Sequence, residues 1–237
     1  MSRLLTHTRG LCSWRERLAS PDRQWKRRYS AFEAAVSWES ASSSRSGIPS
    51  ELDKLLRENN YADPVLLLGI AEHTVPLPGG HAASQSDVWA LISTSLGFVS
   101  LSVEAKARES FGNESLDDWL VAGDTEESRK NRKARWAHIR ENLPTAESFG
   151  HVRYQILHRC AAAVIEAKRL GCPNAAFVVQ AFNTPEPSFQ DYAAFGAALN
   201  LPAVRGGLSI TSVNGISLGI GWIDCPVASD AEVAACA

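Results

Sequence analysis

The most constraining feature of the sequence is the segment 87–106, DVWALISTSLGFVSLSVEAK, in which two largely apolar stretches flank a short turn. Apolar runs of this length, bounded by a turn, are typical of β-strands. With the turn centred between Ser95 and Leu96, the two strands pair as an antiparallel hairpin in which the numbers of opposite residues sum to 191. Asp87 is then expected directly opposite Glu104, with Cβ atoms about 4.5–5.5 Å apart.

Two carboxylates at this distance predict a site for a cation, because they repel each other unless a proton or a metal ion lies between them. Mg²⁺ prefers oxygen ligands at about 2.0–2.1 Å and fits Asp87 and Glu104, with the carbonyl of Ala105 as an additional ligand. Side chains alternate along a strand, so Lys106 is expected on the same face as Glu104. Its ammonium group would help to activate a metal-bound water or offset the charge on a phosphorane-like transition state.

Asp87 followed on the next strand by Glu104-Ala105-Lys106 resembles the D…(D/E)xK motif of the PD-(D/E)xK nuclease superfamily, which has the restriction-endonuclease-like fold. The resemblance implies a nuclease that hydrolyses DNA phosphodiester bonds, with Mg²⁺ or Mn²⁺ on the two acids and Lys106 as catalytic lysine. It also implies that Gln155, in RYQILHR, lies near the metal. Glu72, upstream, is a further candidate metal ligand. The whole chain also looks similar to an uncharacterised bacterial domain family of this fold.

The order of expected elements agrees with the αβββαβ core of that fold, with a mixed central sheet. We predict core elements at Ser50–Asn59, Pro64–Ile70, Asp87–Ile92, Phe98–Glu104, Arg153–Leu170 and Ala175–Phe182. Outside this core we predict helices at Ser30–Glu39, Glu126–Asn142 and Phe189–Leu199, a loop at Ala71–Ser86, and a hairpin of Leu208–Val213 with Ile216–Trp222. The fold class is therefore α/β, with an N-terminal helical extension and a C-terminal hairpin.

The polar stretch SASSSRSG divides the chain into two parts. Residues 1–47 are expected to be a basic helical extension, and residues 48–225 the nuclease-like domain. Residues 113–145 are interpreted as a helical insertion that either binds substrate or only decorates the fold. Residues 226–237 are expected to be a frayed tail. Ser86 stands where the motif of the superfamily has its proline.

Charge is unevenly distributed along the 237 residues, whose net charge is −2. Residues 1–30 contain eight basic and two acidic residues, so the rest of the chain is acidic. Bulk charge therefore argues against non-specific nucleic-acid binding, and contacts must come from local basic patches. The expected contacts are Arg129, Lys130, Arg132, Lys133 and Arg159, with the segment RQWKRR at 23–28 as a second patch; the alternative is that both patches only aid solubility.

Other functions stay open at this stage. A non-catalytic nucleic-acid-binding or regulatory module on the same fold is the main alternative, and a nuclease that needs a partner within a defence system is another. DNA is the expected partner, with RNA as an alternative and homodimerisation left open. No apolar run approaches the roughly 18 residues of a membrane helix, so no membrane association is expected. Five dispersed cysteines without a CxxC pair favour a reducing, cytoplasmic location.

Overall fold

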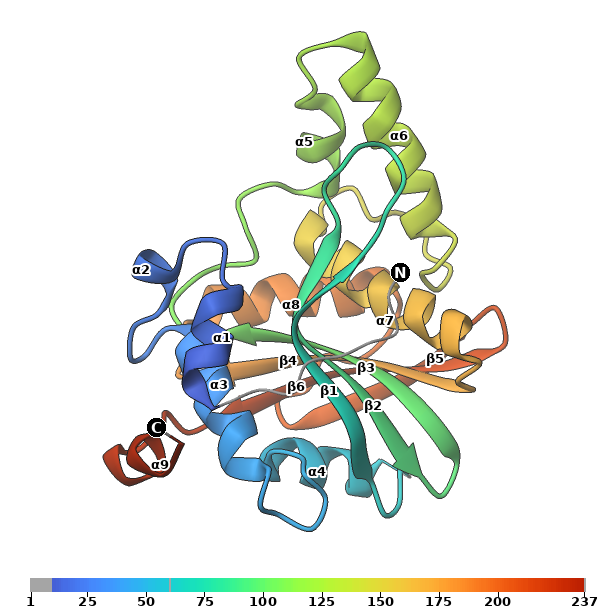
Figure 1. The fold of residues 1–237 in the computed structure, drawn as a ribbon. Coiled ribbons are helices and arrows are strands. Elements are labelled where there is room, and N and C mark those ends of the chain that lie inside the picture. Colours follow the sequence, from blue (N-terminus) through green and yellow to red (C-terminus); the bar gives the residue numbers. More distant parts are fainter. Residues whose placement is uncertain (1–9, 60, 237) are drawn as a thin grey trace.

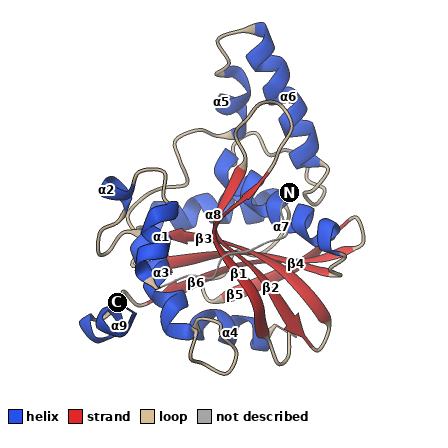
Figure 2. Ribbon diagram, viewed as in Figure 1, coloured by secondary structure: helices blue, strands red, loops and turns tan. Residues whose placement is uncertain are grey.

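The computed structural model describes residues 10–59 and 61–236. These residues form three layers, in which helices cover both faces of a central sheet (Figures 1 and 2). The strands are β1 (Val65–Val75), β2 (Ser84–Thr94), β3 (Gly97–Lys106), β4 (Asn174–Phe182), β5 (Gly207–Val213) and β6 (Ile216–Cys225). The helices are α1 (Leu11–Arg17), α2 (Pro21–Gln24), α3 (Ser30–Ala41), α4 (Ser50–Glu58), α5 (Leu116–Val121), α6 (Glu126–Arg140), α7 (Tyr154–Leu170), α8 (Glu186–Ala198) and α9 (Asp230–Cys236).

The described residues form one six-stranded sheet in the order β1-β2-β3-β4-β6-β5. Strands β1, β2 and β3 are antiparallel neighbours, whereas β4 lies parallel to both β3 and β6. Strand β5 lies at the edge of the sheet, antiparallel to β6. The predicted α/β class with a mixed central sheet is therefore confirmed, and so is the C-terminal hairpin.

Each face of the sheet carries its own apolar core, because successive side chains of a strand point to opposite faces. On β3, Leu101, Val103 and Ala105 are buried in the core beneath α3 and α4. On β4, Phe177 and Val179 belong to the second core, on the side of α7 and α8. The face of β3 that points toward α7 therefore carries the polar side chains Ser100, Ser102, Glu104 and Lys106.

Helix α7 covers that polar face of the sheet. Its buried side packs against β2, β3 and β4, and the Ser100 hydroxyl of β3 donates a hydrogen bond to the Ala163 carbonyl at 2.9 Å. The helix ends at Gly171, whose φ of 68° gives the left-handed conformation that often terminates helices. Gln155 and Arg159, four residues apart, share one face of its first turns.

The β2–β3 hairpin has the predicted register. Its paired residues run from Val88 opposite Val103 to Thr94 opposite Gly97, so the sum of 191 holds throughout. Asp87 lies one residue beyond the last of these pairs. The hairpin therefore ends where the candidate site begins.

Helices α5 and α6 form an arm that projects from the body of the molecule (Figure 1). The ring of Trp119 in α5 stacks on Tyr154 of α7, with centroids 3.8 Å apart. Arg135 of α6 is buried and donates to the carbonyls of Pro78 and Gly79 in the β1–β2 loop. The segment 113–145, expected to be one helical insertion, thus contains two helices joined to the body at both α7 and this loop.

Two expectations about chain segments differ from the structure. The loop expected at Ala71–Ser86 is shorter, because β1 continues to Val75 and β2 already begins at Ser84. The tail expected to be frayed contains helix α9, which packs on α3. Arg27 also pairs with Asp230, so the two ends of the described chain contact each other. Residues 1–9 of the predicted N-terminal extension, and Ala237 of the tail, lie outside the described residues.

No helix in residues 10–59 and 61–236 combines the length and the apolar character that a membrane span requires.

Candidate active site

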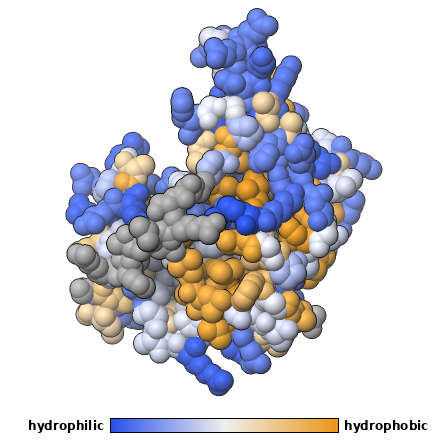
Figure 3. Space-filling view, turned by 45° about the vertical axis from the view of Figure 1, so that its right-hand side comes forward, coloured by the Kyte–Doolittle hydropathy of each residue, from blue (hydrophilic) through white to orange (hydrophobic). Residues whose placement is uncertain are grey.

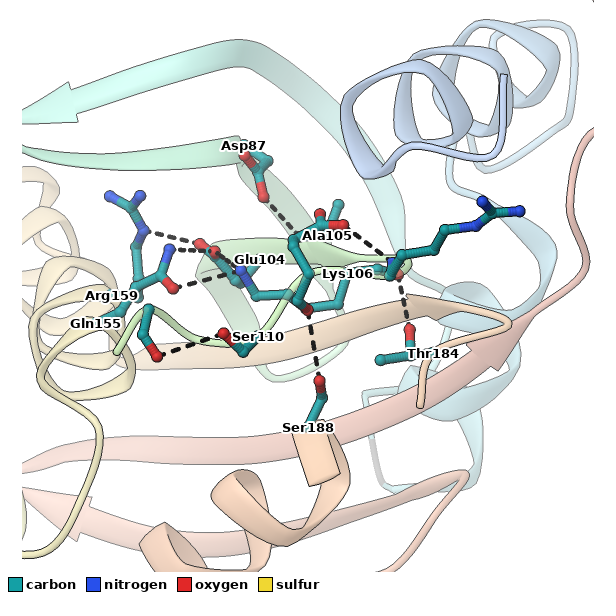
Figure 4. A network of polar contacts seen from close by, with 12 residues as sticks. Asp87, Glu104, Ala105, Lys106, Ser110, Gln155, Arg159, Thr184 and Ser188 are labelled. Atoms are coloured by element: carbon teal, nitrogen blue, oxygen red, sulfur yellow. Dashed lines mark hydrogen bonds and ion pairs between the residues drawn. The ribbon is translucent and has the colours of Figure 1, made fainter. Parts of the chain in front are cut away.

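The site is centred on Glu104 and Lys106, at the carboxyl end of β3 (Figure 4). The two side chains point to the same face, as the strand alternation predicts, and the Lys106 Nζ donates to the Glu104 Oε1 at 2.8 Å. Both side chains are almost fully buried, with 2% of Glu104 and 4% of Lys106 exposed. A buried ion pair of this kind needs further hydrogen bonds to offset its lost hydration.

Helix α7 supplies those further hydrogen bonds. The Gln155 Nε2 donates to Oε1 of Glu104 at 2.7 Å, and its Oε1 accepts from the Lys106 Nζ at 3.3 Å. Arg159 donates from Nε to the other carboxylate oxygen of Glu104 at 2.7 Å. The structure thus brings Gln155 to the position beside the acid and the lysine that the resemblance implies. Arg159, expected to face nucleic acid, instead pairs with the acid.

The charges around Glu104 set its protonation state. Burial by itself would raise the pKa of Glu104, but the positive charges and hydrogen bonds of Lys106 and Arg159 outweigh it and lower the pKa. Glu104 is therefore an ionised carboxylate at neutral pH. An ionised carboxylate is the form that can accept hydrogen bonds on both oxygens or bind a cation.

Asp87 comes from β2, just beyond the last pair of the hairpin. Its Oδ2 accepts a hydrogen bond from the backbone N–H of Ala105 at 2.7 Å, which ties the end of β2 to β3. Burial, followed by the negative charges of Glu104 and Glu72, raises the pKa of Asp87 well above its usual value. The ladder of paired residues ends one position before the predicted Asp87–Glu104 pair, and the two acids line the same cleft.

Glu72 lies inside β1 rather than at the end of a strand. Its φ of 54° is in the left-handed region, which is uncommon for a residue other than glycine. Its Oε2 accepts from the Gln85 Nε2 at 2.6 Å. Burial is the main cause that raises the pKa of Glu72 to about 7, and the negative charge of Glu104 adds to it. Glu72 and Asp87 are both acids whose charge the site disfavours.

These groups line one cleft of about 420 Å³. Acids from β1, β2 and β3, together with Glu109, line it with Lys106 and Arg159, so four carboxylates share two cations. Burial is the main cause of the raised pKa values of Glu72 and Asp87, and the negative charge of the neighbouring acids adds to it. A proton or a hard cation would relieve this surplus of negative charge.

The donor chemistry of the cleft fits a divalent cation such as Mg²⁺ or Mn²⁺. Asp87 and Glu104 offer carboxylate oxygens, with Glu72 and the Ala105 carbonyl as additional expected ligands. The side chains of the described residues do not gather three acidic, histidine or cysteine ligands around one point. Mg²⁺ does not require this, because proteins often hold it through one or two carboxylates with water and substrate phosphates as its other ligands.

The expected nucleic-acid contacts on α6 divide into two kinds. Lys130 and Lys133 are exposed on the arm. Arg129 instead donates to the Gly123 carbonyl at 2.8 Å, and Arg132 donates to the Trp119 carbonyl while lying over the Trp119 ring. Figure 3 shows the projecting arm covered mainly by hydrophilic residues, while apolar residues gather on the body below it.

Sequence reasoning missed part of the cleft. Ala19, between α1 and α2, and Gln24 and Ser30 of the N-terminal helices also line it, although they precede the motif by more than fifty positions. Glu109, three residues after the motif lysine, lines it as well. The position of Glu109 directly downstream of the motif was a signal that could have found it. No local signal connects the N-terminal helices to this cleft.

The fold and the site together define a three-layer α/β protein with a buried centre of acids and cations at the carboxyl end of its central strand. The chain belongs to the family described as Domain of unknown function (DUF6946), which matches residues 7–226. No curated protein and no solved structure matches the chain.

Proposed function

We propose that this protein is a metal-dependent nuclease of the PD-(D/E)xK type that hydrolyses DNA phosphodiester bonds. The observation that carries the proposal is the convergence of Asp87, Glu104, Lys106 and Gln155 in one cleft at the carboxyl end of β3. Glu104 and Lys106 belong to one site because their side chains share a face of β3. The Gln155 side chain of α7 hydrogen-bonds to both of them.

The order of elements supports the finer fold assignment. Helix α4, strands β1, β2 and β3, helix α7 and strand β4 follow one another as α, β, β, β, α, β. Their strands are adjacent in the sheet in the same order. This is the αβββαβ order of the restriction-endonuclease-like core, with α5 and α6 inserted between β3 and α7.

The residues would divide the chemistry as follows. Asp87 and Glu104 would hold Mg²⁺ or Mn²⁺, with Glu72 and the Ala105 carbonyl as further ligands. When bound, such an ion polarises the phosphate and lowers the pKa of a bound water. Lys106 would hold the attacking water in position and offset the negative charge that grows on the phosphoryl and leaving-group oxygens as the P–O bond to the leaving group breaks. Gln155 would orient Lys106 and Glu104.

Incubation of labelled duplex DNA with the protein and Mg²⁺ or Mn²⁺ tests the proposal. Cleavage is expected for the wild type and a loss of about 10²-fold or more for Lys106→Ala. Lys168→Ala is a matched control, because Lys168 lies on the same helix as Gln155 but contacts Asn142 outside the cleft. Equal cleavage by wild type and Lys106→Ala would overturn the assignment.

Asp87→Asn keeps the assignment testable if Lys106→Ala does not fold. Asparagine retains an oxygen that can accept the Ala105 N–H, so the strand contact survives while the charge is lost. Calorimetric titration with Mn²⁺ is expected to show binding by wild type and much weaker binding by Asp87→Asn. Identical Mn²⁺ binding by both proteins would remove Asp87 from the metal site.

A second candidate is a non-catalytic nucleic-acid-binding or regulatory module. One observation favours it: Lys106, Gln155 and Arg159 already occupy both carboxylate oxygens of Glu104. Oε1 of Glu104 accepts two of these hydrogen bonds and Oε2 accepts the third, so a metal ion must use the remaining lone pair of Oε2 or displace a donor. If neither Asp87 nor Glu104 affects binding of any divalent ion, the module is the better description.

The partners follow from the proposed reaction. DNA is the proposed substrate, with RNA of the same sequence as the comparison in the cleavage assay. Activity that appears only with a second copy of the chain or with a defence-system protein would assign the nuclease to an assembly. Sedimentation with and without DNA measures the first of these possibilities directly.

A further inference from the structure

A set of exposed cations extends outward from the candidate active site. Arg23 and Lys26 of the N-terminal extension and Arg108, two residues after Lys106, line a cavity of about 750 Å³. Arg28 and Arg108 line a neighbouring cavity of about 790 Å³ at the ends of β4 and β6. We call Arg23, Lys26, Arg28 and Arg108 the basic wall.

The cavities are continuous with the active-site cleft. Glu72, Asp87 and Glu109 line both the 420 Å³ cleft and the 750 Å³ cavity. Arg108 lines both the 750 Å³ and the 790 Å³ cavities. One groove therefore runs past the carboxyl ends of the parallel strands β3, β4 and β6, which is where open α/β sheets commonly bind ligands.

The basic wall retains its charge for an external partner. Two other N-terminal cations are paired within the chain, Arg15 with Asp22 and Arg27 with Asp230. Within the described residues, no ion pair joins Arg23, Lys26, Arg28 or Arg108 to an acid. The acids that line the groove are Glu72, Asp87, Glu104 and Glu109 near the active site, and Asp224, which pairs with Arg205.

We propose that this groove binds the sugar–phosphate backbone of DNA, with the N-terminal extension as one wall and the candidate active site at its inner end. The inference rests on the proposed nuclease function for its substrate. A row of unpaired cations beside the acid cluster proposed to bind a metal ion matches a polyanion that must bring one phosphate to that ion. The N-terminal extension is then a substrate-binding element.

The groove is a stronger candidate for this role than the α6 arm. On the arm, Arg129 and Arg132 donate to carbonyls of their own chain, and Lys130 and Lys133 line neither the active-site cleft nor the adjoining cavities. The basic wall residues, in contrast, line cavities that share residues with the cleft. Charge on the wall therefore acts where a scissile phosphate would enter.

The test measures binding of a fluorescein-labelled 30-base-pair DNA by anisotropy, in EDTA and over a range of salt concentrations. The variant Arg23→Gln/Lys26→Gln/Arg108→Gln is expected to lose about tenfold or more in affinity and to reduce the salt slope by about 3. The matched control is Arg45→Gln/Lys54→Gln/Arg57→Gln, which removes three exposed cations of the α3–α4 region that line none of these three cavities. Less than a twofold change is expected for the control.

Either of two results would overturn the proposal: unchanged affinity in the basic-wall variant, or an equal loss in the control. All three wall substitutions are at exposed positions, where effects on stability are usually small, and circular dichroism verifies the fold. Because EDTA removes divalent ions, the anisotropy assay tests DNA binding by the groove independently of DNA cleavage. DNA binding that depends on the wall, without cleavage when Mn²⁺ is added, would uphold the groove and refute the nuclease.

Discussion

Replacing Glu72 by glutamine is expected to stabilise the protein at pH 8 and to leave its stability nearly unchanged at pH 4. Burial raises the pKa of Glu72 from 4.5 to about 7. Between pH 4.5 and about pH 7 the folded chain keeps a proton on Glu72 that the unfolded chain has released, so wild-type stability falls as the pH rises. Glutamine carries no charge, retains an acceptor for Gln85, and is free of this cost.

The size of the effect follows from the pKa change. A difference of about 2.5 pH units at about 1.4 kcal/mol each sets an upper value of about 3.5 kcal/mol above pH 7. Because the side chain is partly exposed and solvent screens its charge, about 2 kcal/mol is the expected gain. In a chain of this length that corresponds to a rise in Tm of about 4–8 °C.

Thermal unfolding of Glu72→Gln and wild type at pH 4 and pH 8, in EDTA, measures the difference. Glu147→Gln is the matched control, because Glu147 is exposed and outside the cleft. Mn²⁺ at pH 8 is expected to raise the Tm of wild type more than that of Glu72→Gln, since a cation relieves the same buried charge. An equal difference at both pH values, or a less stable variant at pH 8, would refute the electrostatic reasoning.

Three further predictions concern the network, the core and the arm. Arg159→Leu leaves Glu104 with one cation fewer and raises the pKa of Glu104. Urea unfolding should therefore show a free energy of unfolding about 3–5 kcal/mol lower than that of wild type at pH 7.5, and this difference should shrink toward pH 4. Leu101→Ala, at a fully buried position of β3, should cost about 2–5 kcal/mol in the same assay. Gly79→Ala places a Cβ 2.0 Å from the Asn131 carbonyl oxygen at a φ of +77°, so limited proteolysis should cut the α5–α6 arm faster than in wild type.

The sequence by itself determined the hairpin and the residues that share its faces. Alternation along a strand depends only on the local backbone, so the register of β2 and β3 and the shared face of Glu104 and Lys106 could be predicted from the segment 87–106. The place of Gln155 beside them was implied by the resemblance to the nuclease superfamily rather than by the local pattern of the segment. The predicted residue roles in catalysis stay predictions.

Only the tertiary structure decided which charges meet in the cleft. Arg159 pairs with Glu104 across 55 positions of the chain, and the Asp87 side chain accepts a hydrogen bond from the Ala105 N–H. The N-terminal helices close one side of the groove although nothing in their local pattern points there. The physical reason is range: strand alternation is set between neighbouring residues, whereas burial and pKa depend on groups that packing brings together from distant parts of the chain.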